Sequence, residues 1–474
     1  MMKQHTYALL KMLGIFALFF PATLKAVELK GGMHAGFWYL KNNVDQSENY
    51  LSQDGYGNSY VQGQYTLLNL RLKMDVLDLT ESESQKKTNL HFKTRALINP
   101  FEHQYSLAVP DRYRFQVDTA AIEFENLARN FDLWLGRQII EEMGGIGVDG
   151  LKALVELQSD LHLGIYGGLG NDLRNLTGYI GPNYRLNPVS LDFLAGGMYV
   201  SFRSSKLQAD LGINSLFYEN KLDRVNLFAS SMYRLSGQVN LSGLLDLGVA
   251  GDQGLSRAHM YVTYYPTSSI TLKSGYIRYR SLYFSQSDQS GIPVPSNINS
   301  SFTFPNETDT SAYNIFRQEV RYRIERDSVF GSIEYAKRSF DDAQRFRYSV
   351  GYHHPKLFQD FVDLRTQVDI IDNYRGFNTS YSLTLGKDFM DDQLRVETRG
   401  IFYANERDGF VNGSFDQSKD QIEKEATGQI TFLYMPQAKL HWSLSYAFHR
   451  EVDVENDAQN VNLHDIYISS NIRF

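Results

Sequence analysis

Apolar and polar residues alternate along most of this chain, and the alternation predicts β-strands with one apolar face and one polar face. Residues 68–76 show it most clearly: every second residue is Leu, Met or Val, and the positions between them are Asn69, Arg71, Lys73 and Asp75. Convincing helical periodicity is nearly absent beyond the N-terminal region. We therefore expect an all-β fold in which one face of each strand is exposed to water.

Three later segments repeat this pattern with charged residues on the polar face. They are 316–325, 362–370 and 394–402, and each sets arginines and carboxylates opposite aromatic or aliphatic residues. If the strands close into a barrel with a polar interior, these charged residues face the pore. The pore-lining candidates are Arg71, Lys73, Arg137, Arg317, Glu319, Arg321, Arg323, Arg345, Arg347, Asp363, Arg365, Arg395, Glu397 and Arg399.

The connections between strands separate by length when they are assigned alternately to two sides. About 22 strands can be placed, with counts down to about 18 left open because boundaries are the least certain part of such an assignment. One side has tight turns such as Ser159-Asp160 and Arg326-Asp327. The long connections all fall on the other side: 42–60, 100–114, 170–188, 285–314, 405–425 and 450–463. This asymmetry predicts a single antiparallel transmembrane β-barrel with short periplasmic turns and long extracellular loops.

Two local features depart from the regular pattern. The outer connections near Asn220 and Tyr374 are very short, and the strand parity slips within 276–284, which predicts a bulge there. A soluble β-sandwich would also show alternation. In a sandwich, however, short and long loops are not expected to lie on opposite sides. The separation of the connections by length therefore favours the barrel.

The last residues, 464–474, form one alternating strand that ends on an aromatic residue. Ile466, Ile468, Ile472 and Phe474 fall on its apolar face. This segment resembles the closing strand of bacterial outer-membrane proteins, whose terminal aromatic belongs to the signal read by the insertion machinery. The resemblance implies that Phe474, Ile472 and Ile468 form a barrel-assembly signal and that the protein lies in an outer membrane, with lipid and lipopolysaccharide around it.

The N-terminal residues have the organisation of a cleavable signal peptide. Lys3 and Lys11 supply positive charge, residues 12–20 form a short apolar core, and a small residue, Ala26, precedes the expected cleavage point. The apolar run is about half of the roughly 20 residues that a transmembrane helix needs. The expected organisation is therefore a signal peptide over 1–26 and one barrel domain over 27–474.

A glycine-rich hairpin in the first third adds a second resemblance. Gly136-Arg137-Gln138 is followed by a glycine turn and by Asp149-Gly150. This arrangement is similar to the "GRQ, glycine turn, DG" hairpin of bacterial porins and of alginate-export-like barrels. It implies a porin-like outer-membrane protein. From the residues alone, Arg137 and Asp149 form either an ion pair in the wall or a contact to a solute.

The amino-acid composition limits the binding partners and bound groups expected for this protein. The formal charge falls from −7 to −10 once Lys3, Lys11 and Lys25 are removed with the signal peptide, so nucleic acid is not expected as a partner. The chain has no cysteine, which excludes disulfides and cysteine-ligated metals. It has 31 Tyr and 30 Phe against 3 Trp. Such aromatic residues suit the girdles at the two membrane interfaces of a barrel.

Motifs that carry enzyme chemistry are not found. Gly145, Gly147 and Gly150 match the spacing of a dinucleotide fingerprint, but a strand follows them where that motif needs a helix. His353 and His354 are adjacent, so on a strand they face opposite ways and suit a shared metal poorly. We therefore expect no enzyme, no cofactor and no metal site, with a barrel hydrolase as the alternative left open.

A barrel of this width implies a water-filled lumen that loops must narrow. The segment from Ser285 to Asn314 is the best candidate for such a loop. The leading hypothesis is a passive channel for small hydrophilic solutes with weak anion preference, since carboxylates are interleaved with the arginines. The alternatives are a conduit for an anionic polymer such as a polysaccharide, as the alginate-export resemblance implies, and a surface scaffold or adhesin.

Overall fold

The computed structural model describes the chain in thirteen stretches. These are 28–42, 64–79, 86–98, 113–171, 193–218, 221–250, 254–280, 312–339, 344–357, 362–373, 376–411, 414–453 and 461–474. The predicted signal peptide lies outside the described residues, as does most of the segment from Ser285 to Asn314. In the described part of the chain, no helix is long and apolar enough to cross a membrane.

Twenty-two strands make up almost all of the described structure, with a short 3₁₀ helix, η2, between β5 and β6. The strands are β1 (Glu28–Asn42), β2 (Gln64–Leu77), β3 (Lys87–Ile98), β4 (Tyr113–Ala128), β5 (Phe131–Ile140), β6 (Ile146–Gln158), β7 (Leu161–Asn171), β8 (Phe193–Arg203), β9 (Leu207–Tyr218), β10 (Lys221–Arg234), β11 (Val239–Ala250), β12 (Gly254–Thr267), β13 (Ile270–Arg280), β14 (Ala312–Ile324), β15 (Asp327–Arg338), β16 (Gln344–Lys356), β17 (Val362–Asn373), β18 (Gly376–Phe389), β19 (Leu394–Val411), β20 (Ser414–Gln437), β21 (Leu440–Asp453) and β22 (Val461–Arg473). The helix η2 spans Glu141–Met143. The expected all-β class and the count of 22 are confirmed.

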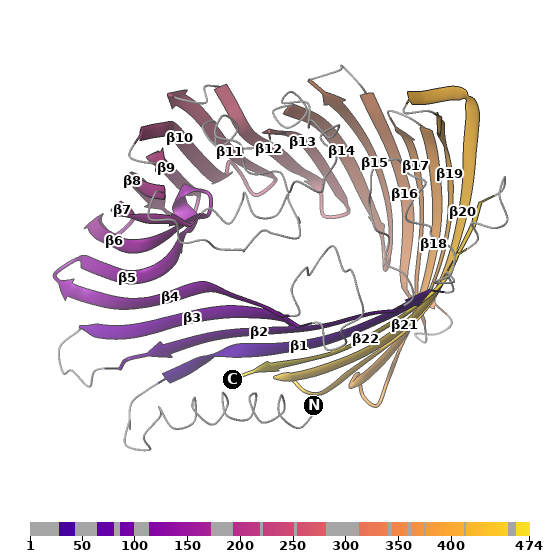
Figure 1. Cartoon of the computed structure of the whole chain (residues 1–474), viewed down its shortest axis with the longest axis horizontal. Helices are drawn as coiled ribbons and strands as arrows, with labels where there is room; N and C mark the ends of the chain where they lie inside the picture. The colour runs from indigo at the N-terminus through magenta and orange to yellow at the C-terminus, as the bar shows by residue number, and fades with distance from the viewer. Residues whose placement is uncertain are drawn as a thin grey trace.

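The sheet closes on itself. Each strand pairs antiparallel with its neighbours in the chain, and β1 also pairs antiparallel with β22, so the 22 strands form a ring (Figure 1). At the closing seam Gly31 and Phe474 exchange two backbone hydrogen bonds, with N···O distances of 3.0 and 3.2 Å. A closed antiparallel ring leaves no unpaired edge, which is the condition for a sheet to cross a lipid bilayer.

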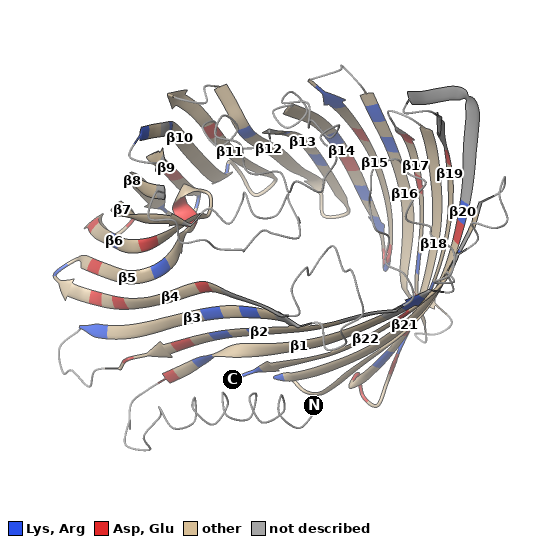
Figure 2. Cartoon of the chain, viewed as in Figure 1, with Lys and Arg blue, Asp and Glu red and all other residues tan. Residues whose placement is uncertain are grey.

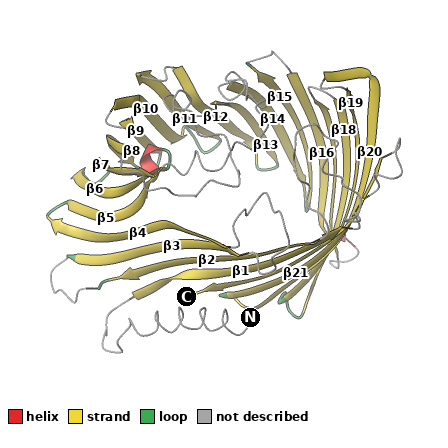
Figure 3. Cartoon of the chain, viewed as in Figure 1, coloured by secondary structure: helices red, strands yellow, loops and turns green. Residues whose placement is uncertain are grey.

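The two faces of the ring differ in polarity. The helix η2 lies inside the ring, on the inner side of β7 to β9 (Figure 3), and it packs against Tyr199, which fixes the inner face of β8. Residues that lie opposite each other on paired strands share a face, so the pairing registers extend the inner and outer faces from β8 to the other strands. Residues on the outer face are exposed and apolar, as Phe316, Val320 and Ile324 show with about half of their surface free. That outer face suits lipid.

The closing strand has the predicted faces. Ile468, Ile472 and Phe474 are 43%, 36% and 38% exposed on the outer surface. Asp465, on the other face, bonds with Trp38 of β1 inside the ring. Aromatic side chains also follow one another around the outer face near the loop end, where Tyr276, Phe316, Tyr335 and Phe346 are in ring contact from β13 to β16. Such a row is expected at a membrane interface.

The connections confirm the tight turns but correct part of the loop assignment. Two-residue turns join β6 to β7 and β14 to β15. The expected loop at 405–425 is wrong, because β19 continues to Val411, β20 begins at Ser414, and these two residues pair. Residues 405–425 are mostly polar in sequence, so the alternation of apolar and polar residues did not reveal the strands there.

Another expectation fails in β13. A bulge was expected within 276–284, but β13 pairs with both β12 and β14 in unbroken register from Tyr276 to Tyr279. Residues 281–284 lie outside the described part. The apparent slip in parity arises because the registers place Tyr276 and Arg278 on the outer face and Ile277 and Tyr279 on the inner face. Both faces therefore carry tyrosine here, and polarity does not distinguish them.

We predict that the seam between β22 and β1 tolerates no side chain at Gly31. A Cβ there would lie 2.3 Å from the Lys73 carbonyl oxygen and 2.8 Å from the Phe474 ring, so the strands would have to separate. Gly31→Ala should therefore lower the temperature at which the folded barrel loses its compact electrophoretic mobility. Gly428→Ala is the control, because nothing lies within 4 Å of its added methyl group. Equal melting of the two variants would contradict this role of the seam.

Candidate functional site: the inner wall of the barrel

Charged residues recur along β14 to β19 (Figure 2), and the pairing registers place most of them on the inner face of the ring. On β14, Glu319 lies between two arginines and contacts both: Arg317 Nη2 is 3.3 Å and Arg321 Nη2 is 3.5 Å from its carboxylate oxygens. Both arginines are about half exposed. The alternation of strand residues places all three side chains on the same face, so their charges partly cancel.

The next two strands continue the same arrangement. Arg345 on β16 contacts Glu334 on β15 at 2.5 Å, and Arg347 contacts Asp369 on β17 at 2.9 Å. Asp369 also accepts a hydrogen bond from Ser349, which is buried. These pairs join adjacent strands, so they stabilise the wall as well as neutralising it.

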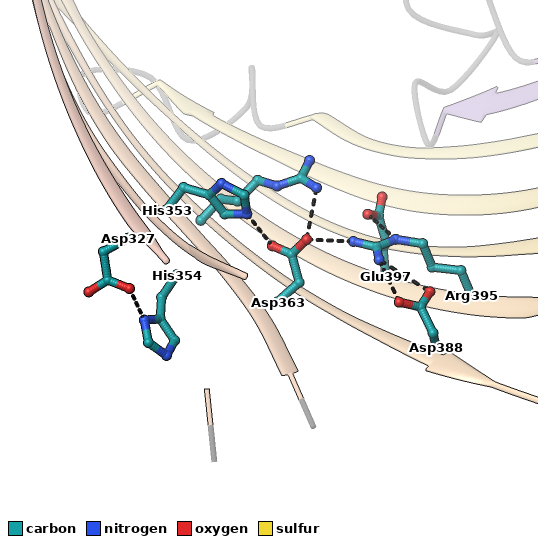
Figure 4. Close-up of polar contacts among 8 residues, drawn as sticks. Asp327, His353, His354, Asp363, Asp388, Arg395 and Glu397 are labelled. Carbon is teal, nitrogen blue, oxygen red and sulfur yellow. Dashed lines mark hydrogen bonds and ion pairs between the residues drawn. The ribbon is translucent and has the colours of Figure 1, made fainter. Parts of the chain in front are cut away.

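Asp363 is the centre of a larger ion-pair network near the turn end of β16 to β19. It accepts from Arg365 and Arg395 at 2.9 Å each, and His353 lies 3.1 Å from its other oxygen (Figure 4). Arg395 also contacts Glu397 at 2.8 Å and Asp388 at 3.1 Å, and its side chain is only 17% exposed. A partly buried guanidinium with three carboxylate partners keeps its hydrogen bonds satisfied, which offsets the cost of its desolvation.

Two of the predicted arginines on β14 to β19 differ from the others on these strands. Arg323 and Arg399 make no ion pair with any residue in the described stretches, although both are exposed on the inner face. Arg399 on β19 lies directly opposite Gln429 on β20. The wall of β14 to β19 therefore contains neutralised arginines with a smaller number that remain available to solutes.

The inner face of β1 to β3 has a different charge pattern. Arg71 lies directly opposite Arg95, and Lys73 lies directly opposite Lys93, so like charges face one another across β2 and β3. His34 on β1 is opposite Arg71. Like charges in directly opposed positions destabilise a sheet. Lys73 reaches Asp75 at 3.6 Å, which is a weak compensation for a side chain that is 66% exposed.

Sequence reasoning found Arg71 and Lys73 but missed the partners on β3. Lys93 and Arg95 follow His91 at every second position, so the alternation that identified β2 was also present in β3. The opposite face of β3 includes the polar Thr94 and the small Ala96, which weaken the contrast between the two faces. The opposition of the four cations depends on the register of two strands, and the sequence does not contain that information directly.

Arg137 is part of the wall. It makes a bidentate pair with Asp149, with Nε–Oδ1 and Nη2–Oδ2 distances of 2.7 and 2.6 Å, and its Nη1 donates to the Val117 carbonyl at 3.1 Å. The pairing of β4 with β5 ends at Arg137, so the guanidinium bridges the place where the two strands separate. The geometry agrees with the expected ion pair. The expectation that Arg137 lines the pore is wrong, because the register places Arg137 and Asp149 on the face of the exposed Leu151, opposite to the inward Trp134 and Lys152.

The helix η2 is the inward-folded segment that the structure describes. Met143 is 1% exposed and packs in a cluster with Tyr166, Tyr199 and Leu216 on the inner face of β7 to β9. Gly212 makes room for it, since a Cβ at this position would lie 2.4 Å from the Met143 sulfur. Residues 141–145 therefore narrow the ring on this side, a role that sequence reasoning gave only to 285–314.

An ion pair holds η2 against the wall. Lys152 on β6 donates to Glu142 at 2.9 Å, and its ammonium group lies 5.0 Å from the centre of the Trp134 ring and 5.7 Å from that of Tyr199. Lys152 is only 12% exposed. The charge is compensated by one carboxylate and two aromatic faces, which is favourable for a cation removed from water.

The adjacent histidines face opposite sides, as expected. His353 contacts Asp363 on the inner wall, whereas His354 contacts Asp327 on the outer face together with Tyr352 (Figure 4). Within the described ranges, no group of three or more His, Asp or Glu residues is arranged to hold a metal ion.

Known proteins resemble this chain only distantly. No protein-family model matches the chain, and no curated protein matches it. Among solved structures, OccAB2 of Acinetobacter baumannii is similar at 10% identity and a TM-score of 0.44 over 94% of this chain and 98% of that chain. OpdK of Pseudomonas aeruginosa, solved with vanillate, has 9% identity and a TM-score of 0.43 over 94% and 99%. These values carry no argument about solutes.

The assignment of the fold rests on the strand pairing and the faces of the ring. A closed antiparallel barrel with an even number of strands, tight turns at one end, an apolar outer face and a charged inner face is the architecture of a bacterial outer-membrane barrel. We therefore describe the chain as a porin-like outer-membrane β-barrel.

We predict that Met143 fixes η2 to the wall. Met143→Ala removes a fully buried side chain from the cluster and should reduce the free energy of unfolding in urea by about 2–5 kcal/mol. Met260→Ala is the control, because Met260 is 61% exposed on the outer face of β12. If the two substitutions have the same small effect, η2 does not depend on this packing.

Proposed function

We propose that this protein is a passive outer-membrane channel through which small hydrophilic solutes diffuse. The observation that supports this function is the combination of a closed 22-stranded ring with a charged inner face. A barrel of 16 or more strands is too wide for its wall side chains to fill, so it encloses water unless another segment fills it. No bond is made or broken in this role, and no cofactor or metal takes part.

The exposure of the inner charges supports a hydrated interior. Arg321 and Arg365 are 55% and 51% exposed although both face the inside of the ring. Ionised groups in a dry cavity would have to be fully paired, because the loss of hydration costs several kcal/mol per ion. Half-exposed arginines on the inner face are therefore best accommodated by water in the lumen.

We further propose a weak preference for anions. Carboxylates neutralise most of the arginines on β14 to β19, so this part of the wall attracts neither sign strongly. On β2 and β3, by contrast, Arg71 lies opposite Arg95 and Lys73 opposite Lys93, and this concentration of cations supports a positive potential on that side. Rings or rows of charge set ion selectivity in wide pores.

The interleaved charges favour a diffusion channel over a conduit for an anionic polymer. A polymer path would need a continuous track of uncompensated arginines, whereas Glu319, Asp363 and Glu397 interrupt the arginines along β14 to β19. For assembly, we propose that Phe474, Ile472 and Ile468 act as the signal that the insertion machinery reads, since all three are exposed on the outer face of the closing strand.

We predict steady conductance from the refolded barrel in a planar bilayer, with a reversal potential under a salt gradient that indicates a modest excess of anion current. Arg71→Gln combined with Lys73→Gln should reduce the anion-to-cation permeability ratio by roughly twofold at low salt, where screening is weakest. A folded barrel that conducts no current would contradict the channel function.

The matched control for selectivity is Lys387→Gln. Lys387 lies on the outer face of β18, where its ammonium group is 4.9 Å from the centre of the Phe389 ring, so this change removes a positive charge outside the lumen. Its permeability ratio should equal that of the wild type. If it changes the ratio as much as the double substitution, the cations of β2 do not determine selectivity.

A further inference from the structure

The inner wall formed by β19 to β22 and β1 contains two adjoining hollows that the ion-pair network does not occupy. Their volumes are 300 and 410 Å³. Both are lined by Gln429, Ala447 and Asp465, so they form one continuous depression, which we call the β20–β22 depression. Together they have the size of a site for a small organic molecule.

Aromatic side chains with polar groups line this depression. Trp38 of β1 lies directly opposite Tyr467 of β22 at one end, and Tyr403 of β19 contributes to the other end. Partly exposed aromatic rings of this kind can stack on the apolar face of a flat or cyclic solute. Their polar groups are held in the wall: Trp38 Nε1 donates to Asp465, and the Tyr467 hydroxyl lies 3.4 Å from His34 Nε2. Their positions at both ends suit an elongated molecule.

Hydroxyl and amide groups cover the floor between the aromatic residues. Gln429 Nε2 donates to the Ser445 hydroxyl at 2.7 Å, and the Thr431 hydroxyl lies 3.0 Å from the same Ser445 oxygen. Hydroxyl and amide groups supply both donors and acceptors. A solute rich in hydroxyl groups could exchange hydrogen bonds with this floor without leaving a polar atom unpaired.

Asp465 is the charged group at the centre. Its Oδ1 accepts a hydrogen bond from Trp38 Nε1 at 2.5 Å, and no described residue bonds its Oδ2. Glu425 lies further along the depression and contacts Thr427 and His449. The carboxylates provide strong acceptors for hydroxyl groups, because hydrogen bonds to ionised acceptors are stronger than neutral ones.

The charge of the depression separates it from the rest of the wall. No lysine or arginine is among the residues that line it, and its two carboxylates would repel anions. Arg399 lies opposite Gln429 at its border, which balances part of this negative charge and makes a purely cationic ligand less favourable. The combination favours a neutral molecule with many hydroxyl groups.

We propose that the β20–β22 depression is a binding site for a neutral saccharide, with Trp38 and Tyr467 stacking on a sugar ring and Asp465 accepting hydrogen bonds from its hydroxyl groups. This inference rests on the proposed channel function and adds a solute class to it. Binding on the wall would slow a saccharide in the lumen and make its passage saturable, unlike simple diffusion.

The test uses the full-length refolded barrel and maltotriose as the probe. Maltotriose added to single channels should produce brief interruptions of the current whose frequency rises with its concentration and saturates. Asp465→Asn keeps an oxygen for Trp38 and removes the charge, so it should shorten the mean interruption by about tenfold, the effect expected for the loss of a charged hydrogen bond. Gln429→Ala should also shorten it.

The matched control is Gln367→Ala. Gln367 is an inward-facing glutamine on β17, outside the depression, so its loss should leave the interruptions unchanged. The proposal is overturned if maltotriose causes no interruptions in a barrel that conducts, or if Gln367→Ala and Gln429→Ala have the same effect. Interruptions by tetraethylammonium but not by maltotriose would overturn it in favour of an organic-cation site.

A second measurement separates this proposal from the channel function. Trp38 is one of 3 tryptophans, and Trp134 and Trp442 lie outside the depression, so saccharide binding should change the tryptophan emission of the wild type but not that of Trp38→Phe. This titration needs no current. A barrel that does not conduct but responds to maltotriose would contradict the channel and support the site, whereas a conducting barrel without a response would do the reverse.

Discussion

The backbone pairing of β1 with β22 is the constraint on which the rest of this structure depends. Without it, two strands would carry rows of unpaired N–H and C=O groups, which lipid cannot solvate. With it, every strand has two neighbours, and the alternation of side chains separates the protein into an outer apolar surface and an inner polar one. The lumen and its charges are consequences of that closure.

The inner face uses its charges in three ways. On β14 to β19 most arginines have carboxylate partners, so they link strands as well as lining the lumen. On β2 and β3 the cations oppose one another, an arrangement that costs stability. On β20 to β22 the wall changes to hydroxyl, amide and aromatic groups around one aspartate. A solute would therefore meet different chemistry on different sides of the same lumen.

The strands could be predicted from sequence because alternation reports burial in lipid on one side and water on the other. It predicted about 22 strands, and the sheet contains 22. The main failure was β20, which begins at Ser414 where a loop was expected. Residues 405–425 are mostly polar in sequence, so the periodic signal disappears although the backbone pairing continues.

The site was harder to predict because it depends on which strands become neighbours and in which register. The sequence identified the arginines of β14 to β19, but not that Arg395 would be shared among three carboxylates from three strands. It gave no indication that Met143 would fold inward, because the space for it comes from Gly212, about 70 residues later in the chain. The β20–β22 depression combines residues from the first and the last strands, whose contact is known only once the ring is closed.

The central claim is that one face of each strand meets water in a lumen and the other meets lipid. The chain has no cysteine, so single cysteines can be introduced one at a time over 362–370 of β17 and treated with a charged, membrane-impermeant thiol reagent after insertion into liposomes. The account predicts reaction at alternate positions, including Asp363, Arg365 and Gln367, and protection at Leu364, Thr366 and Val368 between them. Uniform protection, or reaction at both sets of positions, would contradict a water-filled barrel.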